Sequence, residues 1–265
     1  MYKTSELKTL IPFDIETLPI PWGELSKGLQ KLWIEKSHYR FYPQEIEHQK
    51  KKDSISKHNP EISNCDLIIP TFEEIYNKYA GLSPEFSRVW CISFGVFSDT
   101  LQLTVNTLQE ESEKEILEQW VQVLEHYDEL NLAGHNIDGF DIPFILARMA
   151  VNGLVHNYPV QLQLKDAKPW TVKHVDFMND WKGQRREGVS LGLICEILNV
   201  PTPKDKFNND EFTTLMLSGK ITTTEGIEYC EKDVVALANC MIKCSSESSN
   251  FGGSTTVKKW AAKKK

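Results

Sequence analysis

The sequence predicts an α/β protein in which a mixed sheet is flanked by helices, and three observations support this. Short apolar runs with strand composition alternate with longer segments whose apolar residues recur at helical spacing. Two of these runs adjoin across the turn Ser98-Asp99, as the strands of an antiparallel pair do. The chain has 265 residues, of which 40% are hydrophobic and 25% charged, so it can form a sizeable core.

Five runs have the composition of strands. Val89–Phe97 carries few charges, which predicts a central strand, and Leu101–Val105 alternates as its partner. The other three predicted strands are Leu10–Phe13 with the acids that follow it, Leu130–Asn136, and the edge strand Val172–Phe177. Residues 18–88 lie between the first predicted strand and Val89–Phe97. We interpret them as a helical insertion packed on the core, with its basic run solvated.

The predicted helices have recognisable starts. Glu113–Tyr127 is amphipathic, and Pro143 is suited to the first position of a helix that continues through Met149. Ser190 is expected to cap a helix ending before Pro201. Further helices are predicted from Thr71 to Tyr79, from Glu211 to Leu217 and from Thr223 or Thr224 to Lys243, before a Ser- and Lys-rich tail, 245–265, expected to be disordered.

Charge and composition exclude several function classes. The net charge of −7 argues against a protein that holds nucleic acid through bulk positive potential. No apolar leader and no run of membrane-spanning length is present, so we expect no membrane association. The six cysteines are scattered without a zinc-binding spacing, which favours reduced thiols in a cytoplasmic protein.

Two acids follow the first predicted strand closely. If Phe13-Asp14-Ile15-Glu16 is extended, Asp14 and Glu16 point to the same face, because side chains alternate with period two. Two carboxylates on one face are costly unless a cation or water meets them, and hard divalent cations prefer oxygen ligands. The alternative is a solvent-exposed strand end.

Three further residues are placed where they can join this pair. Asp141 lies at or just before a helix N-terminus, where free backbone donors stabilise a carboxylate, although a plain N-cap aspartate explains it equally. Tyr229 and Asp233 are four residues apart in the last predicted helix, so both project from one face. The alternative for Tyr229 is a buried core tyrosine.

Together these segments form three ordered motifs. They are Phe13-Asp14-Ile15-Glu16-Thr17, His135-Asn136-Ile137-Asp138-Gly139-Phe140-Asp141 and Tyr229-Cys230-Glu231-Lys232-Asp233. In type, order and spacing the chain resembles the DEDD superfamily of 3′–5′ exonucleases, whose fold is the ribonuclease-H-like five-stranded mixed sheet. The third motif resembles the tyrosine type, because the position where the histidine type has its histidine is Glu228. The sequence of the first motif, together with the segment Gly81-Leu82-Ser83-Pro84-Glu85-Phe86, most resembles that of the family-B polymerase proofreading exonuclease and its stand-alone bacterial relatives.

The resemblance implies catalytic roles for five residues. Asp14, Glu16, Asp141 and Asp233 would be the ligands of two divalent cations, Mg²⁺ or Mn²⁺. Tyr229 would orient the attacking water; a phenol with an ordinary pKa near 10 is a poor base at neutral pH, so activation of the water falls to the metal.

The resemblance also implies nucleic-acid contacts. The backbone of Thr17 would receive the terminal 3′-hydroxyl, Asn136 would contact a sugar or phosphate, and Phe140 would contact the terminal bases. For Asn136 a turn residue, and for Phe140 a core phenylalanine, are equal alternatives. A basic loop offers phosphate contacts, with a solvated loop as the alternative: Lys182, Arg185 and Arg186.

The implied function is metal-dependent removal of nucleotides from the 3′ end of single-stranded DNA by an exonuclease domain spanning residues 1–244. The first alternative is a 3′–5′ exoribonuclease, because the sequence does not show how the pocket treats a 2′-hydroxyl. The second is a non-catalytic nucleic-acid-binding module that retains the fold. A protein partner that docks on the 18–88 insertion, with the nuclease serving a DNA repair assembly, is a further expectation.

Overall fold

In a computed structural model, the chain forms one mixed sheet with helices on both faces. The structure describes residues 2–41, 71–154, 174–202, 209–246 and 256–257, together with positions 43, 47 and 162. The basic run of the predicted insertion, 50–52, lies outside the described residues. No helix that the structure describes is long and apolar enough to cross a membrane.

The sheet has the strand order β5-β4-β1-β2-β3-β6. At its centre, β1 (Leu10–Pro19) is antiparallel to β2 (Ser87–Phe97) and parallel to β4 (Asn131–Gly134). β3 (Leu103–Leu108) pairs with β2, and β5 (Val175–Asp176) extends the sheet beyond β4. The five predicted strands thus form the predicted ribonuclease-H-like mixed sheet.

Some boundaries differ from the prediction. The predicted edge strand Val172–Phe177 contributes only Val175 and Asp176 to the sheet, and its first two residues are not described. Phe177 instead begins helix α7 (Phe177–Lys182), because the Asp176 side chain accepts a hydrogen bond from the Asn179 backbone and caps that helix. Within the predicted disordered tail, β6 (Thr256–Val257) pairs with β3.

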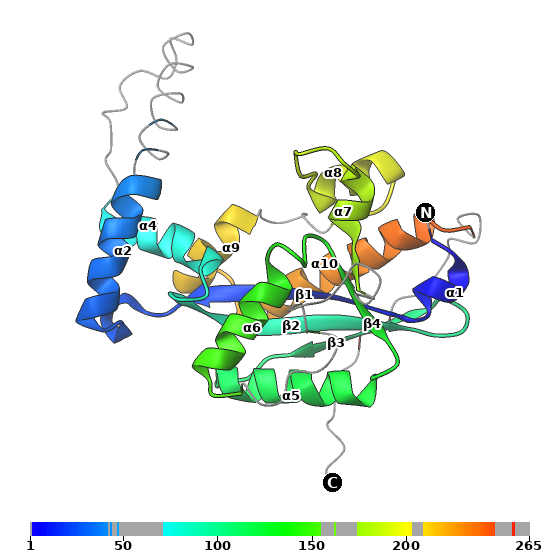
Figure 1. Cartoon of the computed structure of the whole chain (residues 1–265), viewed down its shortest axis with the longest axis horizontal. Coiled ribbons are helices and arrows are strands. Elements are labelled where there is room, and N and C mark those ends of the chain that lie inside the picture. Colours follow the sequence, from blue (N-terminus) through cyan, green and yellow to red (C-terminus); the bar gives the residue numbers. More distant parts are fainter. Residues whose placement is uncertain are drawn as a thin grey trace.

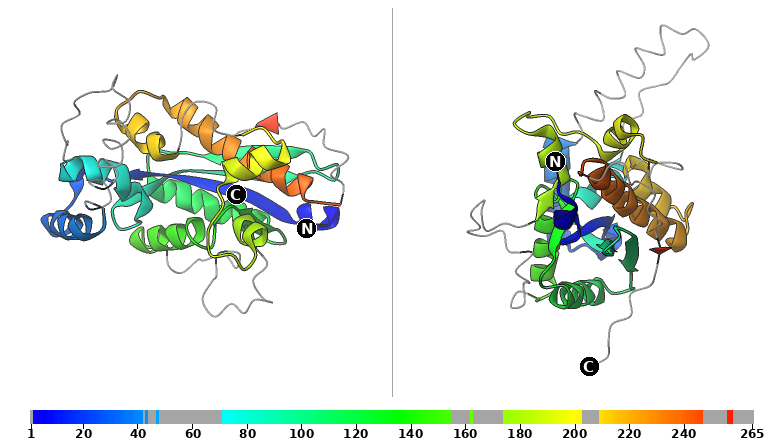
Figure 2. Two further views of the ribbon diagram at one scale, coloured as in Figure 1. Left: turned by 90° about the horizontal axis from the view of Figure 1, so that it is seen from above. Right: turned by 90° about the vertical axis from the view of Figure 1, so that its right-hand side faces the viewer.

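Side-chain alternation along β1 separates the two faces of the sheet. Ile11, Phe13 and Ile15 pack into a core with helices α5 (Glu113–His126) and α6 (Asp141–Val151). The opposite face is covered by α10 (Thr223–Lys243), which packs beside α8 (Leu191–Leu198). Figure 2 shows α5 and α6 on one side of the sheet and α10 on the other. Asp14 and Glu16 therefore point to the α10 side.

The helix starts follow the predicted caps. Ser190 accepts a hydrogen bond from the Leu193 backbone, and Thr71 forms a capping box with Glu74 at the start of α4 (Phe72–Tyr79). Thr222 does the same with Glu225 at α10. Pro143 is the third residue of α6 rather than the predicted first, because the helix begins at Asp141.

The segment between β1 and β2 has a small core of its own. Helix α2 (Lys27–Arg40) and α4 pack around the buried Trp33, with the short turns η1 (Trp22–Glu24) and η2 (Ala80–Leu82). Figure 1 shows these helices at the end of the molecule where β1 ends, opposite α1 (Thr4–Leu7). Leu18 and Arg88, the predicted ends of the insertion, are paired with each other in the β1–β2 ladder.

Candidate active site

Four acids from three elements line one cavity of about 790 Å³. Asp14 and Glu16 come from β1, Asp141 is the first residue of α6, and Asp233 lies in the middle of α10. These are the four predicted metal ligands, and tertiary folding brings them to one place although they span more than two hundred residues of sequence.

A β-bulge shapes the strand beside these acids. Along β1, Glu16 pairs with Cys91 but Thr17 pairs with Val89, so Trp90 is an extra residue on β2. A bulge bends and twists the strand locally and re-aims its side chains. This places Thr17 in the cavity wall, where its hydroxyl donates a hydrogen bond of 2.7 Å to the carbonyl of Gly81.

The acids repel one another in a desolvated setting. Burial raises the pKa of Asp14 well above its ordinary value, and the charges of Asp233 and Asp141 raise it further. The pKa of Glu16 is raised in the same way by burial and then by Asp14. Burial raises the pKa of Asp141 to about 7, although backbone N–H groups of Asp141 and Ile15 lower it. A divalent cation would offset this repulsion, so the donor set fits such an ion.

Tyr229 is buried and is not among the residues that line the cavity. Its ring stacks on Phe212 of helix α9 (Asn209–Leu217) with centroids 5.4 Å apart, and Phe212 itself lines the cavity. Burial raises the pKa of Tyr229, and the nearby charges of Asp233 and Glu16 raise it further. The hydroxyl therefore stays protonated at neutral pH and can act as a hydrogen-bond donor beside the carboxylates.

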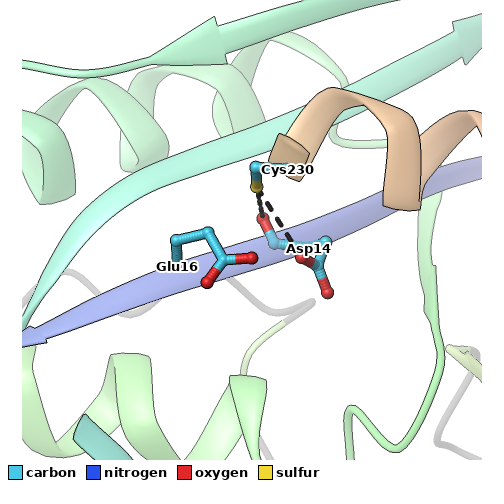
Figure 3. Close-up of side chains that lie close together, drawn as sticks. All are labelled: Asp14, Glu16 and Cys230. Atoms are coloured by element: carbon cyan, nitrogen blue, oxygen red, sulfur yellow. Dashed lines mark hydrogen bonds between the residues drawn. The ribbon is translucent and has the colours of Figure 1, made fainter. Parts of the chain in front are cut away.

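Cys230 is a neighbour of the acids that the sequence interpretation did not single out. Figure 3 shows its thiol facing Asp14, with Sγ 3.6 Å from the Asp14 carbonyl oxygen and 3.7 Å from Oδ2. Possible ligand atoms of Asp14, Glu16 and Cys230 all lie within 4.8 Å of one another. Because burial and the nearby Cys91 raise the pKa of Cys230, the thiol stays neutral and donates to Asp14.

The predicted contacts Asn136 and Phe140 lie in the loop between β4 and α6, and both line the cavity. Asn136 has a left-handed backbone, with φ of 71°, which is uncommon for a residue other than glycine. Asn tolerates this conformation better than most residues. The ring of Phe140 lies 5.3 Å from that of Phe144, so the half-buried Phe140 bridges the core and the cavity.

A buried carboxylate outside the set of four acids, Asp176, fixes this loop. It is 5% exposed, and its two oxygens accept hydrogen bonds from the backbone N–H groups of Asn136 at 3.1 Å and Asp138 at 3.2 Å. The same side chain caps α7. The one sequence signal for Asp176 is an acid inside the apolar run Val175-Asp176-Phe177, which by itself does not predict this role.

The loop between β4 and α6 contributes a further side chain to the same wall. His135 lines the cavity, and its Nε2 lies 2.7 Å from the carbonyl oxygen of Val189, which ties the loop to the start of α8. By contrast, the basic loop residues considered as phosphate contacts, Lys182, Arg185 and Arg186, are not among the lining residues. Arg185 instead donates hydrogen bonds to the carbonyls of Lys182 and Trp181.

Comparison with known proteins agrees with this geometry. Residues 81–260 match the model of a family described as a predicted 3′–5′ exonuclease related to the exonuclease domain of PolB. The match covers more than half of the chain. The chain belongs to this family. Membership confirms the resemblance to DEDD-type exonucleases at the family level, while the tyrosine subtype stays a prediction.

The family match has a boundary that matters for the site. It includes Asp141, Tyr229 and Asp233 but begins at Gly81, after the strand that carries Asp14 and Glu16. The fold therefore brings Asp14 and Glu16, which lie outside the match, to the same cavity as the acids inside it. A search among curated proteins found no match.

Proposed function

We propose that this member of the exonuclease family removes nucleotides from the 3′ end of single-stranded DNA by metal-dependent hydrolysis. The observation that carries the proposal is the convergence of four carboxylates from β1, α6 and α10 on one cavity. The proposed exonuclease domain spans residues 1–244. Family membership supports the class of reaction, and the nature of the acids supports its dependence on metal.

The four acids Asp14, Glu16, Asp141 and Asp233 would hold two divalent cations, Mg²⁺ or Mn²⁺. When bound, such ions activate a water and neutralise charge at the scissile phosphate. Asp141 can serve once it is deprotonated, so ion binding is expected to strengthen as the pH rises through about 7.

Other residues of the chain would position the reactants. The protonated hydroxyl of Tyr229 would donate to or orient the attacking water, as in the tyrosine type, because it lies close to Asp233 and Glu16. Thr17, Asn136 and Phe140 would contact the last nucleotides, since all three line the cavity. Cys230 would hold the Asp14 carboxylate through its thiol.

DNA is the proposed substrate, and RNA is the alternative that the experiment must separate. Matched single-stranded DNA and RNA oligonucleotides carrying a 5′ label are incubated with the protein and Mg²⁺ or Mn²⁺. We expect a ladder of products shortened from the 3′ end for DNA. Degradation of RNA alone would contradict the DNA assignment.

The first prediction concerns Asp14. Asp14→Ala is expected to abolish hydrolysis while the protein still folds, because a metal ligand is lost and repulsion among the acids falls. The measurement is the initial rate of product formation, with circular dichroism to check folding. Asp99→Ala, an exposed turn residue outside the cavity, is the matched control. A wild-type rate for Asp14→Ala would remove Asp14 from the site.

A further inference from the structure

Part of the cavity wall is built by the segment between β1 and β2, most of which precedes the family match. Lys78, Tyr79, Gly81 and Leu82, from the end of α4 and from η2, line the cavity together with the acids. Only Gly81 and Leu82 of these four lie inside the matched residues. The segment between β1 and β2 therefore contributes to the site itself as well as to the end of the molecule seen in Figure 1.

This wall is held firmly against the strands that carry the acids. The Tyr76 hydroxyl lies within hydrogen-bond distance of two carbonyl oxygens, 2.6 Å from that of Ile20 and 2.8 Å from that of Phe86. The Gly81 carbonyl accepts from the Thr17 hydroxyl, one residue after Glu16. Tyr76 is fully buried against Trp33, so α4 cannot move far relative to β1.

Lys78 is the one lysine or arginine among the described residues that line the cavity. Its side chain is exposed, and its ammonium lies 5.2 Å from the centroid of the Tyr79 ring. The Tyr79 ring also stacks on Phe41, with centroids 4.6 Å apart. Packing against an aromatic ring restricts the flexible lysine stem and favours its ammonium near the cavity.

The charges around the cavity indicate what the Lys78 ammonium can bind. Metal ions would neutralise the acids and the scissile phosphate, but the next phosphates of a strand would still meet a protein of net charge −7. A lysine acts as a point charge for phosphate. We propose that Lys78 binds a non-scissile phosphate of the single strand, so that the segment between β1 and β2 is a substrate-binding wall. This proposal rests on the proposed exonuclease function.

The first test compares Lys78→Gln with Lys31→Gln. Lys31 lies in the same segment on α2, with its side chain 79% exposed beside Glu35, and does not line the cavity. For Lys78→Gln we expect KM for single-stranded DNA to rise about tenfold with kcat unchanged, as for loss of one charged contact. Lys31→Gln should match the wild-type protein. Equal KM for both variants would overturn the proposal.

A second test locates the phosphate. Oligonucleotides with a single uncharged methylphosphonate at successive linkages are bound to the protein in Ca²⁺, and affinity is followed by fluorescence anisotropy at several salt concentrations. We expect the wild type to lose affinity at one non-scissile linkage, and Lys78→Gln to lose nothing more there. The salt slope of Lys78→Gln should be shallower by about 0.7. Equal penalties and slopes in both proteins would overturn the assignment.

The two proposals fail in different ways. If the wild-type protein hydrolyses no oligonucleotide with Mg²⁺ or Mn²⁺, the proposed function fails. The binding measurement still decides the role of Lys78, because it needs no turnover.

Discussion

At the scale of single residues, the site depends on polar groups that are buried or half-buried. Asp14, Glu16 and Asp141 carry raised pKa values because burial and mutual repulsion disfavour their charged forms. Around them, Cys230 and Asp176 hold the acids and the neighbouring loop in place. Asp14, Glu16 and Asp141 therefore trade folding stability for a geometry suited to a cation and a phosphate.

Tyr229 gives a prediction at this scale. Tyr229→Phe is expected to lower kcat about 100-fold, because the positioned hydroxyl is lost, while the ring still stacks on Phe212 and stability changes little. The measurements are single-turnover hydrolysis and thermal unfolding. Tyr127→Phe, at the C-terminal end of α5, is the control and should keep the wild-type rate. An unchanged kcat for Tyr229→Phe would leave the tyrosine as a core residue.

Asp176 gives a second prediction at the scale of single residues. In Asp176→Asn, the amide can no longer accept at both oxygens from the N–H groups of Asn136 and Asp138. We expect a loss of about 1–3 kcal/mol in the free energy of unfolding and a raised KM at temperatures where the variant is fully folded. Urea unfolding and steady-state kinetics measure these. Asp180→Asn, which replaces the carboxylate that accepts from the Tyr2 hydroxyl with an amide, should leave KM unchanged.

At the scale of elements, the position of each acid depends on how its helix or strand is fastened. Helix α6, which presents Asp141, is tied to α5 by a buried ion pair, with Arg148 Nη2 2.6 Å from Glu113 Oε2. Glu113 also accepts from the Val89 backbone in β2, and Arg148 donates to the Pro84 carbonyl. This network connects α5, α6 and β2 on the face of the sheet opposite α10.

Breaking this network should loosen α6. Arg148→Met is expected to lower the free energy of unfolding by about 3–5 kcal/mol, because it leaves the Glu113 carboxylate buried without its partner. Chemical denaturation measures the change. Lys114→Met breaks an exposed pair with Glu118, whose side chains are 54% and 47% exposed, and should cost less than about 1 kcal/mol. Similar losses in both variants would contradict the special weight given to the buried pair.

Helix α10 could be predicted more completely than the loop that follows β4. The sequence predicts a helix from Thr223 or Thr224 to about Lys243, and α10 runs from Thr223 to Lys243, because helical spacing is a local property of the chain. The conformation of Asn136 is set instead by Asp176, forty residues away in the sequence. No local pattern around Asn136 contains that information, so the sequence predicts only a turn there.

At the scale of the whole molecule, Asp14, Glu16 and Asp141 make the metal-free fold sensitive to pH. The pKa of Asp141 is about 7 in the folded state and 3.8 ordinarily, so between these values the folded state binds more protons than the unfolded state. The contribution of Asp141 is therefore full below about pH 4 and is lost as pH rises through about 7. The raised pKa values of Asp14 and Glu16 act in the same direction.

This reasoning gives a prediction for the metal-free protein. In EDTA, we expect the free energy of unfolding to fall by an amount on the order of 3 kcal/mol as pH rises from 5 to 8. The thermal midpoint should fall with it. Mn²⁺ at pH 8 should restore the midpoint, because a cation offsets the repulsion. Asp141→Asn should show a smaller fall with pH. A wild-type midpoint that does not change between pH 5 and 8 would contradict the coupling among the acids.

The sequence by itself determined what depends on near neighbours. Alternation in β1 put Asp14 and Glu16 on one face, and helical spacing put Tyr229 and Asp233 on one face of α10, because backbone geometry fixes both periods. The tertiary structure alone decided which groups support that site. Cys230 and Asp14 are separated by 216 residues. Their contact depends on which face of the helix packs against which side chains of the strand. That relation is set by packing across the whole sheet, and the same packing placed Lys78 in the cavity wall.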